Sequence, residues 1–191
     1  MTGVGWVGGL VGANIEEGPV SNSYSTGSVT GDEGVGGLVG WNEASPVSNS
    51  YSTGNVTGNY GVGGLVGFTT GTVSNSYSTG RVTGDTRVGG LVGENTGTVS
   101  NSYSTGRVSG IEIVGGLVGW NDWTVTDSFW DIETSGQATS TGGTGKTTAQ
   151  LQDIATFLGA TWDIVMVAPG VTNPTYTWNI VDTETYPFLS W

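Results

Sequence analysis

Apolar residues recur at a fixed spacing along the first 130 residues of the chain. The tetrapeptide Gly-Leu-Val-Gly begins at Gly9, Gly37, Gly64, Gly90 and Gly116, in steps of 28, 27, 26 and 26 residues. A second motif, Val-Ser-Asn-Ser-Tyr-Ser-Thr-Gly, begins at Val20, Val47, Val73 and Val99, and a degenerate fifth copy starts at Val125. A shorter Val-Thr-Gly or Val-Ser-Gly element begins at Val29, Val56, Val82 and Val108. Since Val, Tyr and Thr favour strands and Gly, Asn and Asp favour turns, each repeat predicts three short strands.

The repeat length indicates how these strands are arranged. One such repeat cannot bury its own apolar face, whereas stacked coils place equivalent side chains on top of each other. A propeller blade usually needs about 40–50 residues, which is too many for this repeat. The pattern therefore predicts an all-β, parallel β-helix-like solenoid of about five coils over residues 1–130, with a β-roll as the rival. One leucine occupies the same place in every repeat, so we expect a buried column of Leu10, Leu38, Leu65, Leu91 and Leu117.

The segment that begins at Val20 leaves one question open. In a regular strand, Val20 and Tyr24 would share one face, and Ser21, Ser23 and Ser25 would lie on the other. Asn22 would then point inward. Either it joins a hydrogen-bonded ladder or the strand bends there. A second column of asparagines follows Gly-Leu-Val-Gly, and Thr69 interrupts the series Asn14, Asn42, Asn95 and Asn121.

The pattern changes after residue 130. Residues 131–191 predict a small mixed cap that contains one helix, because an uncovered coil end is an open sheet edge. Thr147 and Gln150 have the spacing of a capping box. The apolar residues Leu151, Ile154 and Leu158 would then lie on one face of a helix over residues 148–158, which Gly159 would end. The remaining chain is rich in aromatic residues, including Trp162, Trp178 and Trp191.

Charge and composition exclude several functions. The net charge is −12, from 4 basic and 16 acidic residues, so a nucleic-acid partner is not expected. The chain has no Cys and no His, which removes disulfides, thiolate zinc sites and the usual general base. No apolar run approaches the ~20 residues of a membrane-spanning helix, so we predict no membrane insertion. The N-terminus lacks the pattern of a signal peptide and the first motif begins at Gly9, so we expect the chain to be part of a longer protein.

Two local motifs suggest chemistry. Gly142–Thr148 resembles a phosphate-binding loop, but Ser140 stands where that motif requires Gly, so we interpret the segment as a polar loop. Four acids near the end of the array, Asp122, Asp127, Asp131 and Glu133, are weak candidates for Ca²⁺ ligands. The alternative is that they are solvated loop acids, as most acidic residues are. No other cofactor is predicted.

The two repeated motifs together resemble a known family. Gly-Gly-Leu-Val-Gly followed by Asn, and then Val-Ser-Asn-Ser-Tyr-Ser-Thr-Gly, is similar to the GLUG repeat of bacterial surface proteins, over residues 4–130. The segment from Phe129 to Trp191 also resembles the region that accompanies GLUG arrays. The resemblance implies an adhesin-like, filamentous-haemagglutinin-like protein at the bacterial cell surface, with a scaffold role and no catalytic residues.

The predicted function is therefore a non-catalytic extracellular adhesion module that binds a cell-surface glycan or protein. Its candidate site is an aromatic strip of Trp41, Phe68 and Trp120, which follow Gly-Leu-Val-Gly in three repeats. An ice-binding alternative rests on two threonine columns: Thr26, Thr53, Thr79 and Thr105, and Thr30, Thr57 and Thr83 with Ser109. A polysaccharide-acting enzyme is a third possibility that would need a pair of carboxylates in one cleft.

Overall fold

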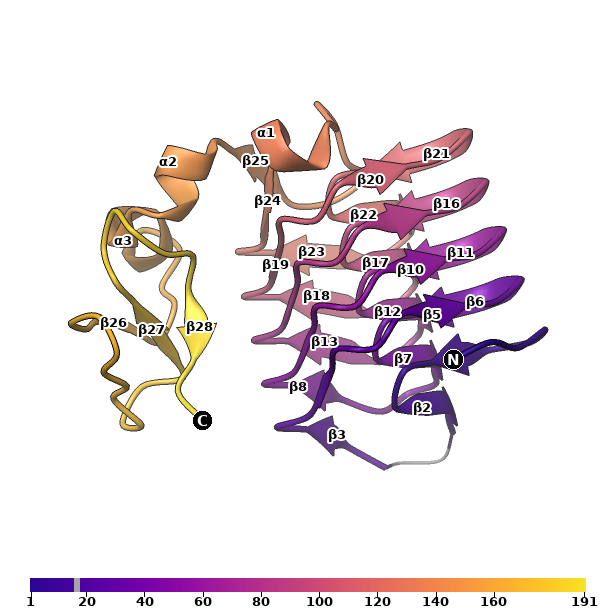
Figure 1. The fold of residues 1–191 in the computed structure, drawn as a ribbon, viewed down its shortest axis with the longest axis horizontal. Coiled ribbons are helices and arrows are strands. Elements are labelled where there is room, and N and C mark those ends of the chain that lie inside the picture. The colour runs from indigo at the N-terminus through magenta and orange to yellow at the C-terminus, as the bar shows by residue number, and fades with distance from the viewer. Residues whose placement is uncertain (16–17) are drawn as a thin grey trace.

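The computed structural model, which describes residues 1–15 and 18–191, confirms a parallel β-solenoid of about five coils with a small mixed sheet at its C-terminal end (Figure 1). The coil over residues 33–57 contains five short strands rather than the three predicted from the motifs. Equivalent strands of successive coils pair in parallel and build five sheets that run along the solenoid. The extra strands arise because the chain bends at Gly37 and Leu38 and again at Asn49, so two of the three segments are each divided into two strands while Val-Thr-Gly gives one.

The five sheets share one register, in which equivalent motif positions pair. The first contains β1 (Val7–Gly8), β6 (Glu33–Gly36), β11 (Tyr60–Gly63), β16 (Thr86–Gly89) and β21 (Glu112–Gly115). The second contains β2 (Val11–Asn14), β7 (Val39–Asn42), β12 (Val66–Thr69), β17 (Val92–Asn95) and β22 (Val118–Asn121). The third contains β3 (Val20–Ser21), β8 (Val47–Ser48), β13 (Thr72–Ser74), β18 (Thr98–Ser100) and β23 (Thr124–Thr126). The fourth contains β4 (Tyr24–Ser25), β9 (Tyr51–Ser52), β14 (Tyr77–Ser78), β19 (Tyr103–Ser104), β24 (Phe129–Asp131) and β25 (Thr144–Lys146). The fifth contains β5 (Val29–Thr30), β10 (Val56–Thr57), β15 (Val82–Thr83) and β20 (Val108–Ser109).

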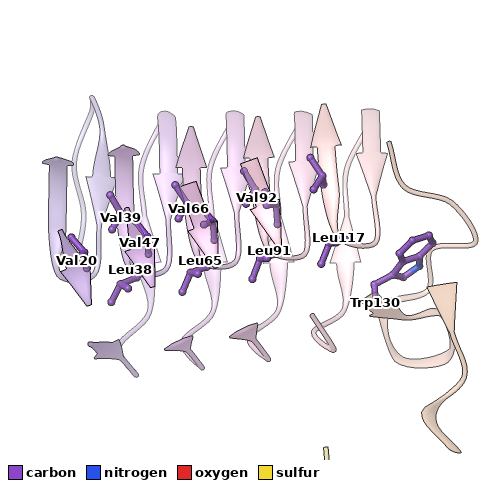
Figure 2. Packing of buried hydrophobic residues seen from close by; sticks show 13 residues of the cluster. Val20, Leu38, Val39, Val47, Leu65, Val66, Leu91, Val92, Leu117 and Trp130 are labelled. Atoms are coloured by element: carbon purple, nitrogen blue, oxygen red, sulfur yellow. The ribbon is translucent and has the colours of Figure 1, made fainter. Parts of the chain in front are cut away.

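The predicted leucine column forms the centre of the main core. Leu38, Leu65, Leu91 and Leu117 are each 0% exposed and stack with two columns of valines (Figure 2). The prediction was wrong for Leu10, which is 52% exposed. Leu10 lies in the first coil, so a leucine of the next coil covers it on one side only. Full burial at this leucine position therefore requires a cover on both sides.

Valines of the first and fifth sheets pack against one another and form a second buried core, which is separate from the leucine core. The two cores are separated where glycines of the Gly-Gly-Leu-Val-Gly motif bring strands close together. A Cβ added at Gly36 would lie 1.9 Å from the carbonyl oxygen of Val39, and one at Gly40 would lie 2.5 Å from that of Gly12. These glycines are needed for close backbone approach, whereas positive φ occurs at other positions such as Gly34 and Gly61.

The Ser-Asn-Ser segment resolves the question left open by the alternation of residues. Asn22 has φ 47°, and its equivalents Asn49, Asn75, Asn101 and Asp127 also have positive φ, so the strand bends there. The bend turns the tyrosines away from the valine face, which corrects the prediction that Val20 and Tyr24 share a face. It also turns the serines inward, so that Ser50, Ser76, Ser102 and Ser128 are buried.

These buried serines explain why the motif repeats so strictly. The Ser76 hydroxyl donates to the carbonyl oxygen of Ser74 at 2.7 Å and accepts from the backbone N–H of Ser50 at 3.2 Å. The same pair of bonds recurs at Ser102, which accepts from Ser76 at 3.1 Å. Each serine thus satisfies a backbone donor of the preceding coil at the bend, where no sheet hydrogen bond is made.

The last coil is covered by the segment that follows it. Trp130 lies on the end of the leucine core and is 5% exposed (Figure 2). The Ser140 hydroxyl accepts the backbone N–H groups of Leu117 and Val118 at 3.2 and 2.9 Å. The short helix α1 (Ile132–Ser135) lies beside this segment, and β25 adds one more strand to the fourth sheet. Gly142–Thr148, which resembles a phosphate loop, therefore includes a strand rather than a loop that cradles phosphate.

Residues beyond β25 form a side lobe, which we define as residues 148–191. It contains α2 (Thr148–Leu151), α3 (Ile154–Leu158), β26 (Ile164–Met166), β27 (Trp178–Ile180) and β28 (Phe188–Leu189). In Figure 1 it lies along the side of the solenoid, next to the coil corners, and does not stack on the last coil. No helix of residues 1–15 and 18–191 is long and apolar enough to cross a membrane.

The single helix predicted over residues 148–158 is two short helices. The capping box of Thr147 and Gln150 is confirmed at α2. The helix breaks because the Asp153 carboxylate accepts the backbone N–H of Ala155 at 2.8 Å and caps α3. The break rotates the second turn, so Phe157 is fully buried and Leu158 is 55% exposed, contrary to the prediction.

Candidate functional site

The predicted aromatic strip is assembled as one column on the second sheet. Trp41 pairs with Phe68, Phe68 pairs with Glu94, and Glu94 pairs with Trp120 in consecutive coils. The Trp41 ring lies 5.7 Å from that of Phe68 and 5.3 Å from that of Trp6, centroid to centroid. Phe68 is only 6% exposed, whereas Trp41 and Trp120 are partly buried. The strip is therefore packed along its length, and its two tryptophans are more exposed than its phenylalanine.

Arg87 fills the gap that Glu94 leaves in this column. Its guanidinium forms an ion pair with the Glu94 carboxylate. It also lies 5.0 Å from the ring centroid of Tyr60 and 4.7 Å from that of Trp120. The arginine continues the stack by cation–π contacts, which sequence reasoning did not foresee. The sequence signal was the repeat alignment, which places Arg87 where the two preceding coils have Gly34 and Gly61.

The two threonine columns are in register, as the ice-binding alternative requires. Thr57 pairs with Thr30 and with Thr83. The hydroxyl-bearing residues Thr26, Thr53, Thr79, Thr30 and Thr57 are exposed, whereas Thr105, Thr83 and Ser109 are partly buried. Midway in the sequence between the two threonine positions, successive coils carry the exposed residues Ser28, Asn55, Arg81 and Arg107. Long arginine side chains therefore interrupt the hydroxyl surface in two coils.

The four acids considered as calcium ligands are not brought together. Asp122 and Asp127 are exposed at separate turns of the last coil, and Asp131 is fully buried. Among the residues that the structure describes, no group of three or more acids is placed to hold a metal ion. Glu133 accepts the backbone N–H of Thr148 at 2.8 Å, so it acts locally at the start of α2.

Asp131 instead joins the end of the solenoid to the side lobe. Its Oδ1 accepts the backbone N–H groups of Glu133 and Thr134 at 2.8 and 3.1 Å and so caps α1. Its Oδ2 accepts the hydroxyls of Thr148 and Tyr186, each at 2.7 Å. Four hydrogen bonds satisfy this buried carboxylate, so its role is structural.

The outward-turned tyrosines form the surface on which the side lobe packs. Tyr24, Tyr51, Tyr77 and Tyr103 stack with centroid distances of 5.2, 4.9 and 5.2 Å. Trp178 of the lobe lies 6.0 Å from Tyr77 and 5.8 Å from Tyr103. Burial raises the pKa of Tyr103 well above its ordinary value and also raises that of Tyr77. Burial, followed by the hydrogen bond to Asp131, raises the pKa of Tyr186 to about 12.

Sequence reasoning missed one further surface, a cleft between the first coils and the side lobe. It is lined by Asn22 and Asn49 of the solenoid and by Asp163, Tyr176 and Trp191 of the lobe. These residues are far apart in the sequence, and nothing in the repeat pattern shows where the lobe packs. The available signal was the match between an aromatic-rich C-terminal segment and a repeated tyrosine.

Comparison with known families finds one match. The family described as the GLUG motif matches residues 6–30, 31–57, 58–83 and 84–109. No curated protein and no solved structure matches the chain. The four matched segments coincide with the first four coils, and the fifth coil and the side lobe lie outside them. Since the matched segments cover more than half of the 191 residues, the chain belongs to the GLUG-motif family.

Proposed function

We propose that this chain is a non-catalytic structural and adhesive module of a bacterial surface protein, displayed outside the cell. The observation that carries the proposal is the shared register of the coils, which repeats every exposed column at the spacing of adjacent strands. Several weak contacts held at a fixed spacing gain avidity without any single strong contact. The buried Ser76 and Asn95 side chains each take part in a hydrogen bond between coils, with the backbone N–H of Ser50 and with Asn121 Oδ1 respectively.

The partly buried Trp41 and Trp120 are the residues of the strip that a partner could contact. Tryptophan is enriched among residues that dominate binding energy, because it brings a large rigid surface with a polar edge. A surface glycan or protein that crosses the coils could contact both rings. Filamentous-haemagglutinin-like surface proteins, which the motifs resemble, are the class to which this proposal assigns the chain.

The test is attachment of the fluorescently labelled chain to bacterial and host cell surfaces. Trp41→Ala and Trp120→Ala should each weaken attachment, and the double variant should weaken it further. Trp123→Ala is the matched control, because Trp123 is 67% exposed and lies outside the strip. Urea unfolding of each variant checks that the solenoid persists. Unchanged attachment of the stably folded double variant would show that the strip is only structural.

The register of the exposed threonine columns supports ice binding as a second candidate. Thermal hysteresis of the native chain that is lost in Thr53→Tyr or Thr79→Tyr would favour this candidate over adhesion. The arginines between the columns make it the weaker of the two, since Arg81 and Arg107 stand out from a surface that must match a flat lattice.

A further inference from the structure

The cleft between the solenoid and the side lobe combines residues that no repeat alone contains. Its volume is about 230 Å³. One wall carries Asn22 and Asn49, which occupy equivalent bends in the first two coils. The other wall carries Asp163, Tyr176 and Trp191 of the lobe. The space is below the ~300 Å³ typical of sites for drug-sized ligands, so it suits one small ring with the rest of the ligand outside.

Trp191 gives the cleft an aromatic edge that is held in place. Its ring lies 6.3 Å from that of Tyr24 and 5.8 Å from that of Tyr51, so the end of the tyrosine stack supports it. Half of its surface stays open, at 50% exposure, and Tyr24 and Tyr176 beside the cleft are 54% and 37% exposed. The face of an aromatic ring carries partial negative charge and attracts the C–H groups of a ligand.

The side-chain oxygens of the cleft favour a ligand that carries hydrogen-bond donors. The Asn49 side chain lines the cleft, and its Oδ1 atom is buried and has no hydrogen-bond partner among the described residues, so a rotation of this side chain is needed to present the acceptor to a ligand. A buried acceptor without a partner is costly, so a site of this kind favours a ligand that brings a donor. The Asp163 Oδ2 atom accepts the backbone N–H and the hydroxyl of Thr177, both at 2.8 Å. These two bonds orient the carboxylate at the edge of the cleft.

A ligand that presents C–H groups on one face and hydroxyl donors at its rim is a sugar ring. The carboxylate of Asp163 and the net charge of −12 disfavour an anionic sugar. We propose that this cleft binds a neutral polysaccharide, with one hexose ring against Trp191 and its hydroxyls on Asn49 and Asp163. The inference rests on the proposed adhesive function in that it supplies a ligand class for the module, at a site separate from the aromatic strip.

The test is native gel electrophoresis of the full chain through gels that contain a soluble neutral polysaccharide: β-glucan, mannan or galactomannan. Hyaluronan serves as the anionic comparison. At least one neutral polymer should retard the native chain, and hyaluronan should not. Trp191→Ala should abolish the retardation. Asn49→Gly, which keeps the positive φ accessible, should weaken binding about tenfold, the loss expected for one hydrogen bond of ~1.4 kcal/mol.

Trp123→Ala is the control and should be retarded like the native chain. Near-ultraviolet circular dichroism shows whether the lobe stays packed in both variants. Asn49→Gly alters a residue of the solenoid and none of the lobe, so loss of binding by a packed Asn49→Gly chain supports the cleft independently. Absence of retardation by every neutral polymer overturns the proposal. Retardation that persists in Trp191→Ala but disappears in the Trp41 and Trp120 variants also overturns it, while adhesion through the strip survives. A native chain that attaches to no cell surface but is retarded through Trp191 supports the cleft and contradicts the adhesive function.

Discussion

The solenoid and the side lobe bury their apolar residues in different ways. In the solenoid, valines and leucines stack on identical residues of the next coil, and most are 0% exposed. In the lobe, unlike aromatic residues pack together, with Trp162 4.8 Å from both Phe157 and Trp178. The first arrangement is determined by a repeat of the sequence, and the second by contacts between segments that share no pattern. The packing of the solenoid is therefore spread over many equivalent contacts between coils, whereas the packing of the lobe depends on a few large side chains.

The largest expected effect comes from removing one member of the leucine column. Leu65→Ala should lower the free energy of unfolding by about 3 kcal/mol, because it leaves a cavity in a core whose neighbours on both sides are fixed. Leu10→Ala changes the same motif position in the exposed first coil and should cost less than about 0.5 kcal/mol. Urea unfolding followed by far-ultraviolet circular dichroism measures both. Equal losses would contradict the view that the leucine position is fully buried only when it is covered on both sides.

The same contrast determines what could be predicted from the sequence. The solenoid, its register and the column of Trp41, Phe68 and Trp120 follow from the repeat, because equivalent positions must stack. The face of Tyr24 could not be predicted, since the alternation rule assumes extended backbone and Asn22 has φ 47°.

The helix over residues 148–158 was predicted as one element because its apolar spacing is helical. The capping role of Asp153, which divides it, competes with that spacing and is decided by the fold of the lobe. The cleft at Trp191 could not be predicted at all, because it depends on where the lobe packs.

At alkaline pH, the side lobe should lose its packing before the solenoid unfolds. The pKa of Tyr186 is raised from 10.0 to about 12 in the folded chain, so the neutral phenol favours the packed lobe. This contribution is fully present below pH 10 and is lost as the pH rises through about 12. Burial also raises the pKa values of Tyr77 and Tyr103, so these two phenols likewise favour the packed state while they are neutral. We expect the near-ultraviolet signal of the lobe to disappear before the far-ultraviolet signal of the solenoid.

Tyr186→Phe separates the contribution of this phenol from general alkaline unfolding. The variant lacks this ionisable phenol, so the loss of the lobe signal should begin at a higher pH than in the native chain. If both signals disappear together in the native chain, the lobe and the solenoid unfold as one unit and the distinction between them fails.

The smallest expected effect concerns the column of asparagines that Thr69 interrupts. Asn14 donates to Asn42 Oδ1 at 2.9 Å, and Asn95 donates to Asn121 Oδ1 at 2.7 Å. Between them, Asn42 donates to the Thr69 hydroxyl at 3.1 Å, and Thr69 makes no side-chain bond to Asn95 among the described residues. Thr69→Asn should complete the ladder, because the new amide can accept from Asn42 and donate to Asn95. Since one net hydrogen bond contributes about 1 kcal/mol, urea unfolding should show a gain of this size.

Asn95→Thr makes the opposite change in the next coil and should lower stability. A Thr69→Asn variant less stable than the native chain would mean that the buried threonine is selected for packing, and that the repeat tolerates the broken ladder because the leucine column already fixes the register.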